Sequence, residues 1–557
     1  MVSPGTERLE NQEPEKPEPL SWLERYGALF LLVLSTLLYF SLVWQYIRSS
    51  PYAHIPILDA RAYWQLAVDV ARQGSPLVSL THSAPLYPLF LTACVYVFGP
   101  NIYAVYAIQA TLAVLTVLLM YQLWQQVFSP LHGFVAGLLS LFYLPFAYYL
   151  TKLLPEVLAI FVLTGFLVIY TNRRLLNTPW GLILLGLFGG SAILARSQFV
   201  FVVLPLLALL LFSRKADAPY NLTLRRLVLV IVFVLLPLLP IGGFNYLHTG
   251  GFYVTAPNGG ITFYEGNNPR AKGTYSSVPG ISDDVNLQLK DMVKMASSHF
   301  GRPVTIWEAD RYFWNKGLSY IKNNPADWFK LELRKIILLL SPKETFTIYD
   351  IYLERKLYLP YLYLFPLGWG ILLPLSLIGI LHIIFAKRET IKNIVPFFVV
   401  GIVLTGMLVI FFVLDRYRLL LLPVVAGFGA HGGIALFEWW KNRRIALAVV
   451  GSGVLLAGIA ASAMIQKPTA PGAWSNLGSI LVRLESFSEA EKVLHKALQT
   501  DPSNPIVINN MIAALLYQDK VKEALPFIEI LLTYPQFSQK AATYRQFIEK
   551  KGYSLSP

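Results

Sequence analysis

Recurring stretches of apolar residues constrain the fold of this 557-residue chain more than any other feature. Each stretch runs for roughly 20 residues, the length that an α-helix needs to cross the ~30 Å hydrocarbon core of a bilayer. Charged residues make up only 14% of the chain, against roughly 25% in soluble proteins, so we expect most of it to lie in lipid. The sequence therefore predicts an all-α, multi-pass membrane bundle.

Length and hydropathy together predict about eleven spans. The expected spans are 26–47, 102–127, 132–150, 155–171, 179–195, 198–213, 227–247, 360–385, 394–414, 417–437 and 445–465. Amphipathic or shorter segments at 60–73, 76–98 and 324–340 are expected to lie in the interface rather than to span it.

Basic residues cluster in four short loops between the predicted spans. The clusters are Arg173 with Arg174; Arg214, Lys215, Arg225 and Arg226; Lys387, Arg388 and Lys392; and Lys441, Arg443 and Arg444. Short basic loops stay in the cytoplasm, and with all four there the spans alternate without conflict. The N-terminus is then cytoplasmic. The loop with Asp59, the segment 248–359 and the C-terminal tail then lie outside, as expected for a protein of the cell membrane.

The two ends of the chain differ from the apolar middle. Residues 1–22 are rich in Pro and Glu and are expected to form a disordered cytoplasmic tail. A membrane domain over 23–466 follows. In 470–545, helix-period apolar residues and alanines recur at the roughly 34-residue period of tetratricopeptide repeats, which predicts an α-solenoid of about two units, although a generic pair of helical hairpins has a similar pattern.

Composition and motifs argue against several kinds of function. The net charge of +14 comes from the short basic clusters, which membrane topology explains, so nucleic acid is not an expected partner. The single cysteine, Cys94, allows neither an internal disulfide nor a thiolate metal cluster. Walker A, dinucleotide-binding and HExxH motifs do not occur in the sequence. A divalent metal is left open.

A few charged residues stand at the ends of the predicted spans on the outer side. Ionisable residues near spans are costly and therefore mark functional sites, which singles out Asp59, Glu156 and Asp415, although each could also be a solvated interfacial carboxylate. Arginine suits a two-pronged grip on phosphate. The arginines at the same level are Arg196, Arg416 and Arg418; the last two could instead anchor a helix end or pair with Asp415.

The outer segment opens with "FNYLHTGGFYVTAPNGGITFYEGNNPRAKGTY", which is rich in Gly, Asn and aromatic residues. Gly and Asn provide turns, and amides and aromatic rings suit sugar hydroxyls and sugar faces, although such turns also occur in loops without function. The expected substrate-loop residues are Asn258, Tyr264, Asn267 and Asn268. Tyr63 joins them from the Asp59 loop, where it also suits the interface.

Taken together, the pieces "DARAYWQLA", "SAPLYPLFLTACVYVFG", "LLPEVLAIFV", "AILARSQFVFVVLP" and "DRYRLLLLP" resemble glycosyltransferases of the GT-C class. This class includes the dolichyl-phosphate-mannose protein mannosyltransferases and the bacterial aminoarabinose lipid A transferases. The resemblance covers roughly residues 30–440, and the predicted repeats follow that region. The chain is similar to a bacterial branch of the class whose members end in such repeats. It implies a membrane enzyme with a polyprenyl-phosphate sugar donor and a glycan, lipid or protein acceptor.

The resemblance also implies roles for individual residues. Asp59 would activate the acceptor, Glu156 would match a later acid, and Arg196, Arg416 and Arg418 would hold the lipid phosphate. A base displacing phosphate from the opposite face inverts the anomeric centre, and the phosphate leaving group needs no general acid. Many relatives have two adjacent acids in the first loop, whereas Ala60 follows Asp59 here, which puts a shared metal site in doubt.

Two other kinds of protein remain open on the sequence. An oligosaccharide ligase or polymerase of the O-antigen type is also multi-pass and uses lipid-linked donors, but it usually depends on Arg and His in a late outer loop. A lipid-linked-sugar transporter or a scaffold would carry charges in the middle of its spans, whereas those of this chain cluster at one face. The repeats suggest a protein partner in each case.

Overall fold

The computed structural model describes residues 22–73, 84–212, 223–249, 251–282, 285–344, 348–385, 388–464 and 472–550. The predicted N-terminal tail lies outside these residues, apart from Trp22. The described residues form helices throughout, joined by turns and a single isolated bridge between Tyr143 and Leu367. The expected all-α fold is confirmed.

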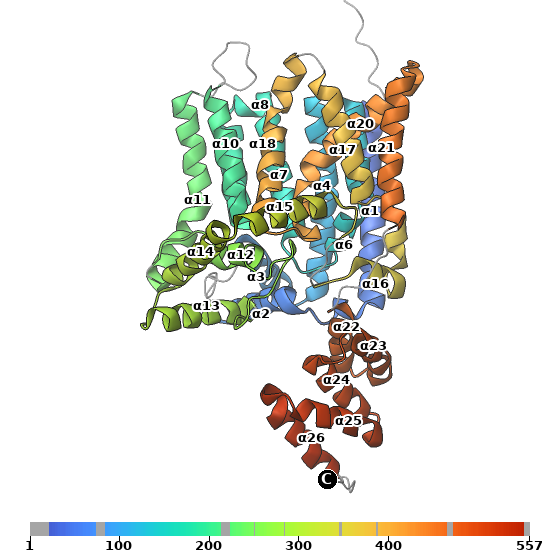
Figure 1. The fold of residues 1–557 in the computed structure, drawn as a ribbon. Coiled ribbons are helices and arrows are strands. Elements are labelled where there is room, and N and C mark those ends of the chain that lie inside the picture. Colours follow the sequence, from blue (N-terminus) through green and yellow to red (C-terminus); the bar gives the residue numbers. More distant parts are fainter. Residues whose placement is uncertain are drawn as a thin grey trace, which may run out of the picture.

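Apolar helices stand side by side in a bundle (Figure 1). They are α1 (Trp22–Ser49), α4 (Ile102–Val127), α5 (Pro130–Leu141), α7 (Glu156–Thr171), α9 (Pro179–Ala195), α10 (Val200–Phe212), α11 (Leu224–Thr249), α17 (Trp369–Ile384), α18 (Arg388–Ile410), α20 (Leu422–Lys441) and α21 (Ile445–Met464). Six segments within the described residues are long and apolar enough to cross a membrane alone: Trp22–Ser49, Ile102–Val127, Leu224–Leu247, Asn393–Ile410, Asp415–Lys441 and Ile445–Met464. The other bundle helices are shorter, so the count of eleven spans stays a prediction.

The predicted span 132–150 is wrong as one continuous helix. α5 ends at Leu141, and the short α6 (Leu144–Tyr149) begins after a break. Pro145 explains the break, because its ring clashes with the carbonyl four residues earlier and it has no N–H to donate. The freed backbone pairs with residue 367 instead, since the N–H of Leu144 donates to the Leu367 carbonyl at 2.8 Å.

The predicted span 360–385 begins too early. Residues Pro360–Leu364 form the separate 3₁₀ turn η3, and α17 starts only at Trp369. From there α17 packs along α20. A Cβ on Gly379 would lie 2.0 Å from the Phe428 carbonyl oxygen, so glycine allows the two backbones to approach closely.

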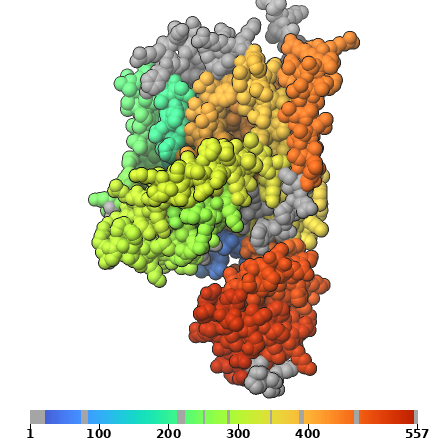
Figure 2. Space-filling model, viewed as in Figure 1, coloured from blue at the N-terminus to red at the C-terminus, as the bar shows by residue number. Residues whose placement is uncertain are grey.

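Helices outside the bundle lie across one of its ends (Figures 1 and 2). They are α2 (Leu58–Gln73), α3 (Leu86–Phe98), α12 (Gly259–Gly266), α13 (Val285–Phe300), α14 (Ile306–Asn323), α15 (Pro325–Leu340) and α16 (Ile351–Leu357). α2, α3 and α15 correspond to the three expected interfacial segments, although residues 74–83 lie outside the described part. Short turns join the elements: η1 (Pro51–Ala53), α8 (Arg173–Leu176), η2 (Ser197–Phe199), α19 (Asp415–Arg418), η4 (Leu419–Leu421) and η5 (Pro535–Phe537).

The C-terminal helices form a separate lobe beyond the outer helices (Figure 2). They are α22 (Ala473–Arg483), α23 (Phe487–Thr500), α24 (Pro505–Leu516), α25 (Val521–Leu532) and α26 (Ser538–Lys550). Small residues allow the helices to pack, because a Cβ on Gly478 would lie 2.4 Å from Leu494, and Ala490 and Ala524 are fully buried. Two helix pairs are compatible with the predicted repeats, whose identity as tetratricopeptide units stays a prediction.

Candidate active site

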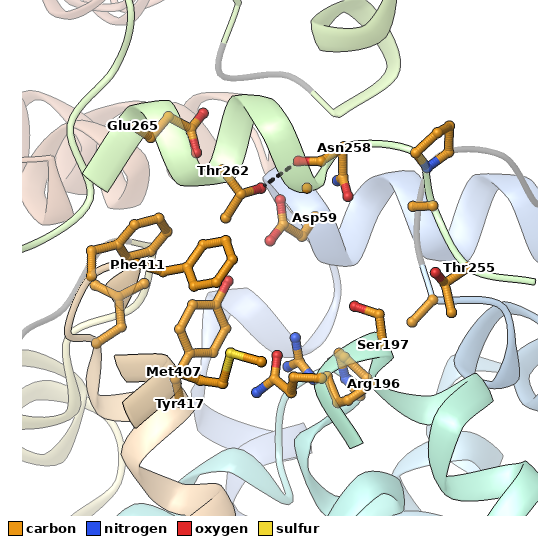
Figure 3. A pocket seen from close by; sticks show the side chains of 18 of the residues that line it. Asp59, Arg196, Ser197, Thr255, Asn258, Thr262, Glu265, Met407, Phe411 and Tyr417 are labelled. Carbon is orange, nitrogen blue, oxygen red and sulfur yellow. Dashed lines mark hydrogen bonds between the residues drawn. The ribbon is translucent and has the colours of Figure 1, made fainter. Parts of the chain in front are cut away.

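A cavity of about 720 Å³ lies between the end of the bundle and the outer helices (Figure 3). One side is formed by residues from α2, from the turn between α9 and α10, and from α19. The other side is formed by the segment before and within α12 and by α14. Asp59, Arg196 and Arg416, which are far apart in sequence, all line this cavity.

Asp59 enters the cavity from the first turn of α2. The preceding residue, Leu58, has a φ of +48°, in the left-handed region that a bulky side chain rarely adopts. Such outliers persist only where the surrounding structure holds them, and they cluster at functional sites. The sharp start of α2 therefore supports a functional reading of the carboxylate that follows it.

Four charged side chains and one aromatic ring form a continuous array beside the cavity. Asp59 Oδ2 accepts a hydrogen bond from Arg416 Nη1 at 2.8 Å. The Arg416 guanidinium carbon lies 5.1 Å from the centre of the Tyr417 ring, and that of Arg196 lies 5.3 Å from the same ring. Arg196 then forms an ion pair with Glu156, which is fully buried. Tyr417 thus holds two cations near one ring, each with its own carboxylate.

Several polar atoms of the array are buried without a hydrogen-bond partner among the described residues. Within the described part of the chain, the Nε atoms of Arg196 and Arg416 are buried and have no hydrogen-bond partner, and the same holds for Glu156 Oε2. The two arginine side chains are each 15% exposed. Cations that are largely shielded from water attract an anion more strongly than exposed ones, and guanidinium geometry matches phosphate. The array can therefore bind a phosphate group.

The opposite side of the cavity carries carboxylates, amides and indoles. Trp307, Asp310 and Trp314 are spaced three and four residues apart on α14, so they share one face of that helix, and all three line the cavity. Burial raises the pKa of the Asp310 carboxyl, although its Oδ1 accepts the Gly260 N–H at 2.6 Å. This side suits hydroxyl groups and the flat faces of sugar rings.

Of the expected substrate-loop residues, Tyr63 and Asn258 line the cavity. Tyr264 lies instead against Phe313 and beneath Lys316. The amide nitrogen of Asn267 donates to the carbonyls of Phe263 and Ile410, and that of Asn268 donates to the Tyr264 carbonyl. The last three expected residues hold the outer segment together and are not among the residues that line the cavity, so we leave them out of the candidate site.

Arg418 also lies away from the cavity lining. It is 1% exposed, forms an ion pair with Glu344, and donates to the carbonyls of Ser341 and Lys343 at 2.7 and 2.9 Å. These contacts join α19 to the segment after α15. Asp415 is buried too and accepts a hydrogen bond from the Tyr149 hydroxyl at 2.8 Å. Both side chains have structural partners.

Among the described residues, those around Asp59 do not fit a metal ion. The described residues contain no group of three or more His, Cys, Asp and Glu side chains that could hold one. Asp59 is followed by Ala60 and pairs with the Arg416 guanidinium, whose charge opposes a cation at the same carboxylate. We derive no step through a metal.

Sequence reasoning missed Tyr417 and the α14 face. Tyr417 stands between the two arginines of "DRYR", so its position beside them was visible, but only the fold shows that Arg196 reaches the same ring. The spacing of Trp307, Asp310 and Trp314 fits one helix face and could have been found from helical periodicity. What the spacing could not reveal is that this face turns toward Asp59.

Comparisons with known proteins relate part of the chain to a family of transferases. Residues 82–241 match the family model described as dolichyl-phosphate-mannose-protein mannosyltransferase. A search of curated proteins gives no match. Among solved structures, the archaeal oligosaccharyltransferase AglB from Archaeoglobus fulgidus, in complex with an inhibitory peptide and a dolichol-phosphate, is 15% identical with a TM-score of 0.42. That match covers 84% of this chain, which spans 60% of the archaeal chain.

A second similar structure is ArnT from Cupriavidus metallidurans in the apo state. It is 12% identical with a TM-score of 0.38, and the match covers 90% of this chain and 78% of the other. The family match over residues 82–241 agrees with the predicted resemblance to membrane glycosyltransferases for that part of the chain.

Proposed function

We propose that this chain is an integral membrane glycosyltransferase that moves a sugar from a polyprenyl-phosphate donor to an acceptor at the outer face of the membrane. The observation that carries the proposal is the array in which Tyr417 lies between two arginines, with Asp59 paired to one of them. Such an array offers an anion site and a carboxylate base in one cavity. The family description, which names a dolichyl-phosphate sugar donor, supports the same reading.

The donor phosphate binds at Arg196 and Arg416 in this proposal. Next to these arginines the cavity is lined by apolar residues from two bundle helices, Val200 and Phe201 on α10 and Met407 and Leu408 on α18. α10 and α18 pack against each other (Figure 1), and the Phe201 side chain is exposed. A polyprenyl chain leaving the cavity beside these two helices would stay in apolar surroundings while its phosphate reaches the arginines.

Asp59 serves as the base for the acceptor. The acceptor oxygen gives its proton to Asp59 and forms a bond to the anomeric carbon, while the bond from that carbon to the phosphate oxygen breaks and its electron pair stays on the phosphate. Attack and departure on opposite faces invert the anomeric centre. Because Asp59 ends the array, a phosphate held toward Arg196 leaves space for the sugar. Glu156 orients Arg196 through their ion pair.

We propose an orientation in which the cavity opens at the outer face of the cell membrane and the N-terminus lies in the cytoplasm. The cavity and the C-terminal helices lie at one end of the bundle, and α8 with the basic pair Arg173 and Arg174 lies at the other (Figure 1). A reporter fused after Pro557 should therefore behave as external, and a reporter after Arg174 as cytoplasmic. A cytoplasmic C-terminus would contradict the proposed orientation.

Incubation of purified protein with a panel of radiolabelled polyprenyl-phosphate sugars tests the activity, with the labelled product identified chemically. A glycosylated product that forms only with an intact Asp59 supports the proposal. If Asp59→Asn kept full activity while arginines of the outer loop proved essential for transfer, the result would favour a ligase or polymerase instead. Movement of the lipid-linked sugar across the membrane without any transfer product would indicate a transporter.

A further inference from the structure

Helix α2 carries a second polar group one turn beyond Asp59. Tyr63 stands four residues later, so both side chains project from the same face of the helix, and both line the cavity. A single rigid element therefore presents the proposed base and a phenol hydroxyl to the same space. The proposed mechanism assigns nothing to this hydroxyl.

Buried neighbours hold the Tyr63 ring in place. Its edge meets the ring of Tyr87 at a centroid distance of 5.4 Å and an interplanar angle of 80°. The Tyr87 hydroxyl donates to Gln109 Oε1 at 2.7 Å, and Gln109 Nε2 donates to the carbonyls of Leu150 and Lys152 at 3.0 and 2.8 Å. This chain of contacts joins α2 and α3 to α4 and to the turn before α7, so the position of the phenol is fixed by packing.

The charged side chains of the array act on the Tyr63 hydroxyl, which lines the same cavity. Burial and then the Asp59 carboxylate hold the pKa of Tyr63 well above its usual range, Glu156 adds to the rise, and Arg196 and Arg416 oppose it. The phenol thus keeps its proton near neutral pH and is a neutral donor. Tyr63 lines the cavity, and no hydrogen bond joins its hydroxyl to another of the described residues, so the hydroxyl can donate to a molecule in the cavity.

We infer that the Tyr63 hydroxyl donates a hydrogen bond to the phosphate of the donor lipid, beside the guanidiniums of Arg196 and Arg416; this inference rests on the proposed function. A phosphate oxygen is the strongest acceptor that two arginines would attract to this part of the cavity. The acceptor molecule, by contrast, has to donate its own proton to Asp59.

The chemistry of transfer makes this contact stronger as the reaction proceeds. The phosphodiester of the donor has one negative charge, and the released polyprenyl phosphate gains a second when the electron pair of the broken bond stays on its oxygen. A hydrogen bond to that oxygen therefore strengthens toward the transition state and the product. Loss of the hydroxyl should weaken binding of the sugar-free lipid more than binding of the glycosylated donor.

Tyr63→Phe tests the inference, because the variant keeps the ring against Tyr87 and removes only the hydroxyl. Full-length purified protein is titrated with undecaprenyl phosphate, and turnover is measured separately with a saturating donor. We expect about 10- to 100-fold weaker binding of undecaprenyl phosphate, the size expected for one hydrogen bond to a charged group. Turnover should fall as well. Tyr96→Phe is the matched control, since its hydroxyl contacts the α2 backbone at Val70.

The possible outcomes separate this inference from the proposed function. If Tyr63→Phe binds undecaprenyl phosphate normally while Arg416→Ala binds it weakly, the Tyr63 assignment is overturned and the phosphate site stands. If Tyr63→Phe raises only the KM for the acceptor, the hydroxyl belongs to the acceptor and the assignment is again overturned. Normal binding by both variants would remove the phosphate site itself.

Discussion

Asp59 and Arg416 form an ion pair on one side of the cavity, with 2.8 Å between Oδ2 and Nη1. The proposed base and a proposed phosphate ligand therefore contact each other directly. A phosphate that binds Arg416 competes with Asp59 for the same guanidinium, and by taking it releases the carboxylate for the acceptor proton. If the two side chains serve different substrates, single substitutions should separate transfer from donor binding.

Substitution of Asp59 by Asn should abolish most transfer and spare donor binding. The amide keeps the shape of the carboxylate but cannot take the acceptor proton, so turnover should fall by roughly 10²- to 10⁴-fold. Binding of undecaprenyl phosphate should equal that of the wild type or be tighter, because Arg416 loses a competing anion. Titration and single-turnover rates on the same preparation measure both effects. If Asp59→Asn lost binding of undecaprenyl phosphate while the arginine variants bound it normally, the proposed roles of Asp59 and the arginines would be reversed.

Substitution of Arg416 by Ala should weaken donor binding. The change removes one charged hydrogen-bonding partner of the phosphate, which contributes about 1.5–3 kcal/mol. Arg416→Lys should recover only part of the affinity, because an ammonium group lacks the planar fork of a guanidinium. The measurement is titration with undecaprenyl phosphate at two salt concentrations. Full recovery by lysine would show that charge alone is needed there.

The fold was largely predictable because its main determinants are local. Hydropathy over roughly 20 residues locates the apolar helices, and the ends of α4, α7 and α9 agree with their predicted ranges. The break between α5 and α6 was missed because the apolar run continues through it. Only Pro145 marks the break, and a proline is tolerated in many membrane helices. The backbone of Leu144 at this break pairs with Leu367, which is more than 200 positions away in sequence.

The candidate site was predictable in its residue types but not in its pairings. Asp59, Arg196 and Arg416 were expected at one membrane face, and the structure brings them to one cavity. Arg418 follows Arg416 by two residues, so the two side chains leave the short helix α19 in different directions. One reaches Asp59 and the other Glu344. The two-residue spacing predicts that the side chains diverge, but it does not reveal which partner each of them meets.

Arg418 should affect stability rather than donor binding. Arg418→Met removes the ion pair with Glu344 and the hydrogen bonds to backbone carbonyls. The Glu344 carboxylate then stays buried without a compensating charge. Breaking such a pair costs about 3–5 kcal/mol. Thermal unfolding in detergent should show the loss, and the folded fraction should still bind undecaprenyl phosphate. Normal stability with weakened lipid binding would return Arg418 to the phosphate site.

Lys152 should give the protein an alkaline pH dependence. Its Nζ lies 2.7 Å from Glu354 Oε2, yet burial lowers the pKa of this lysine to about 8. An unfolded lysine has a pKa of about 10.4, so between these two values the unfolded chain binds more protons than the folded one. The contribution of Lys152 to the free energy of unfolding should therefore rise from about pH 8 to 10.4.

Thermal unfolding of the wild type and of Lys152→Met across that pH range tests this dependence. The variant lacks the titrating group, so its melting temperature should increase less, or decrease more, with pH than that of the wild type. Groups that do not contact Lys152 titrate alike in both proteins and cancel in the comparison. Parallel curves would show that Lys152 does not titrate in this range.

The C-terminal helices should influence the acceptor and not the donor. They meet the membrane domain at the edge of the cavity, where Asn476 Nδ2 donates to the carbonyl of Ile348 at 3.1 Å, and Ile348 lines the cavity. Helical repeats usually bind polypeptides on a concave face. A chain ending after Ile465 should bind undecaprenyl phosphate normally but lose its preference among acceptors, or its docking to a protein partner. Transfer to a panel of acceptors measures this.

Tyr358→Phe, which removes only the 3.0 Å hydrogen bond to Glu489, should keep the preference. Equal transfer to every acceptor with and without the helices would leave them only a stabilising role.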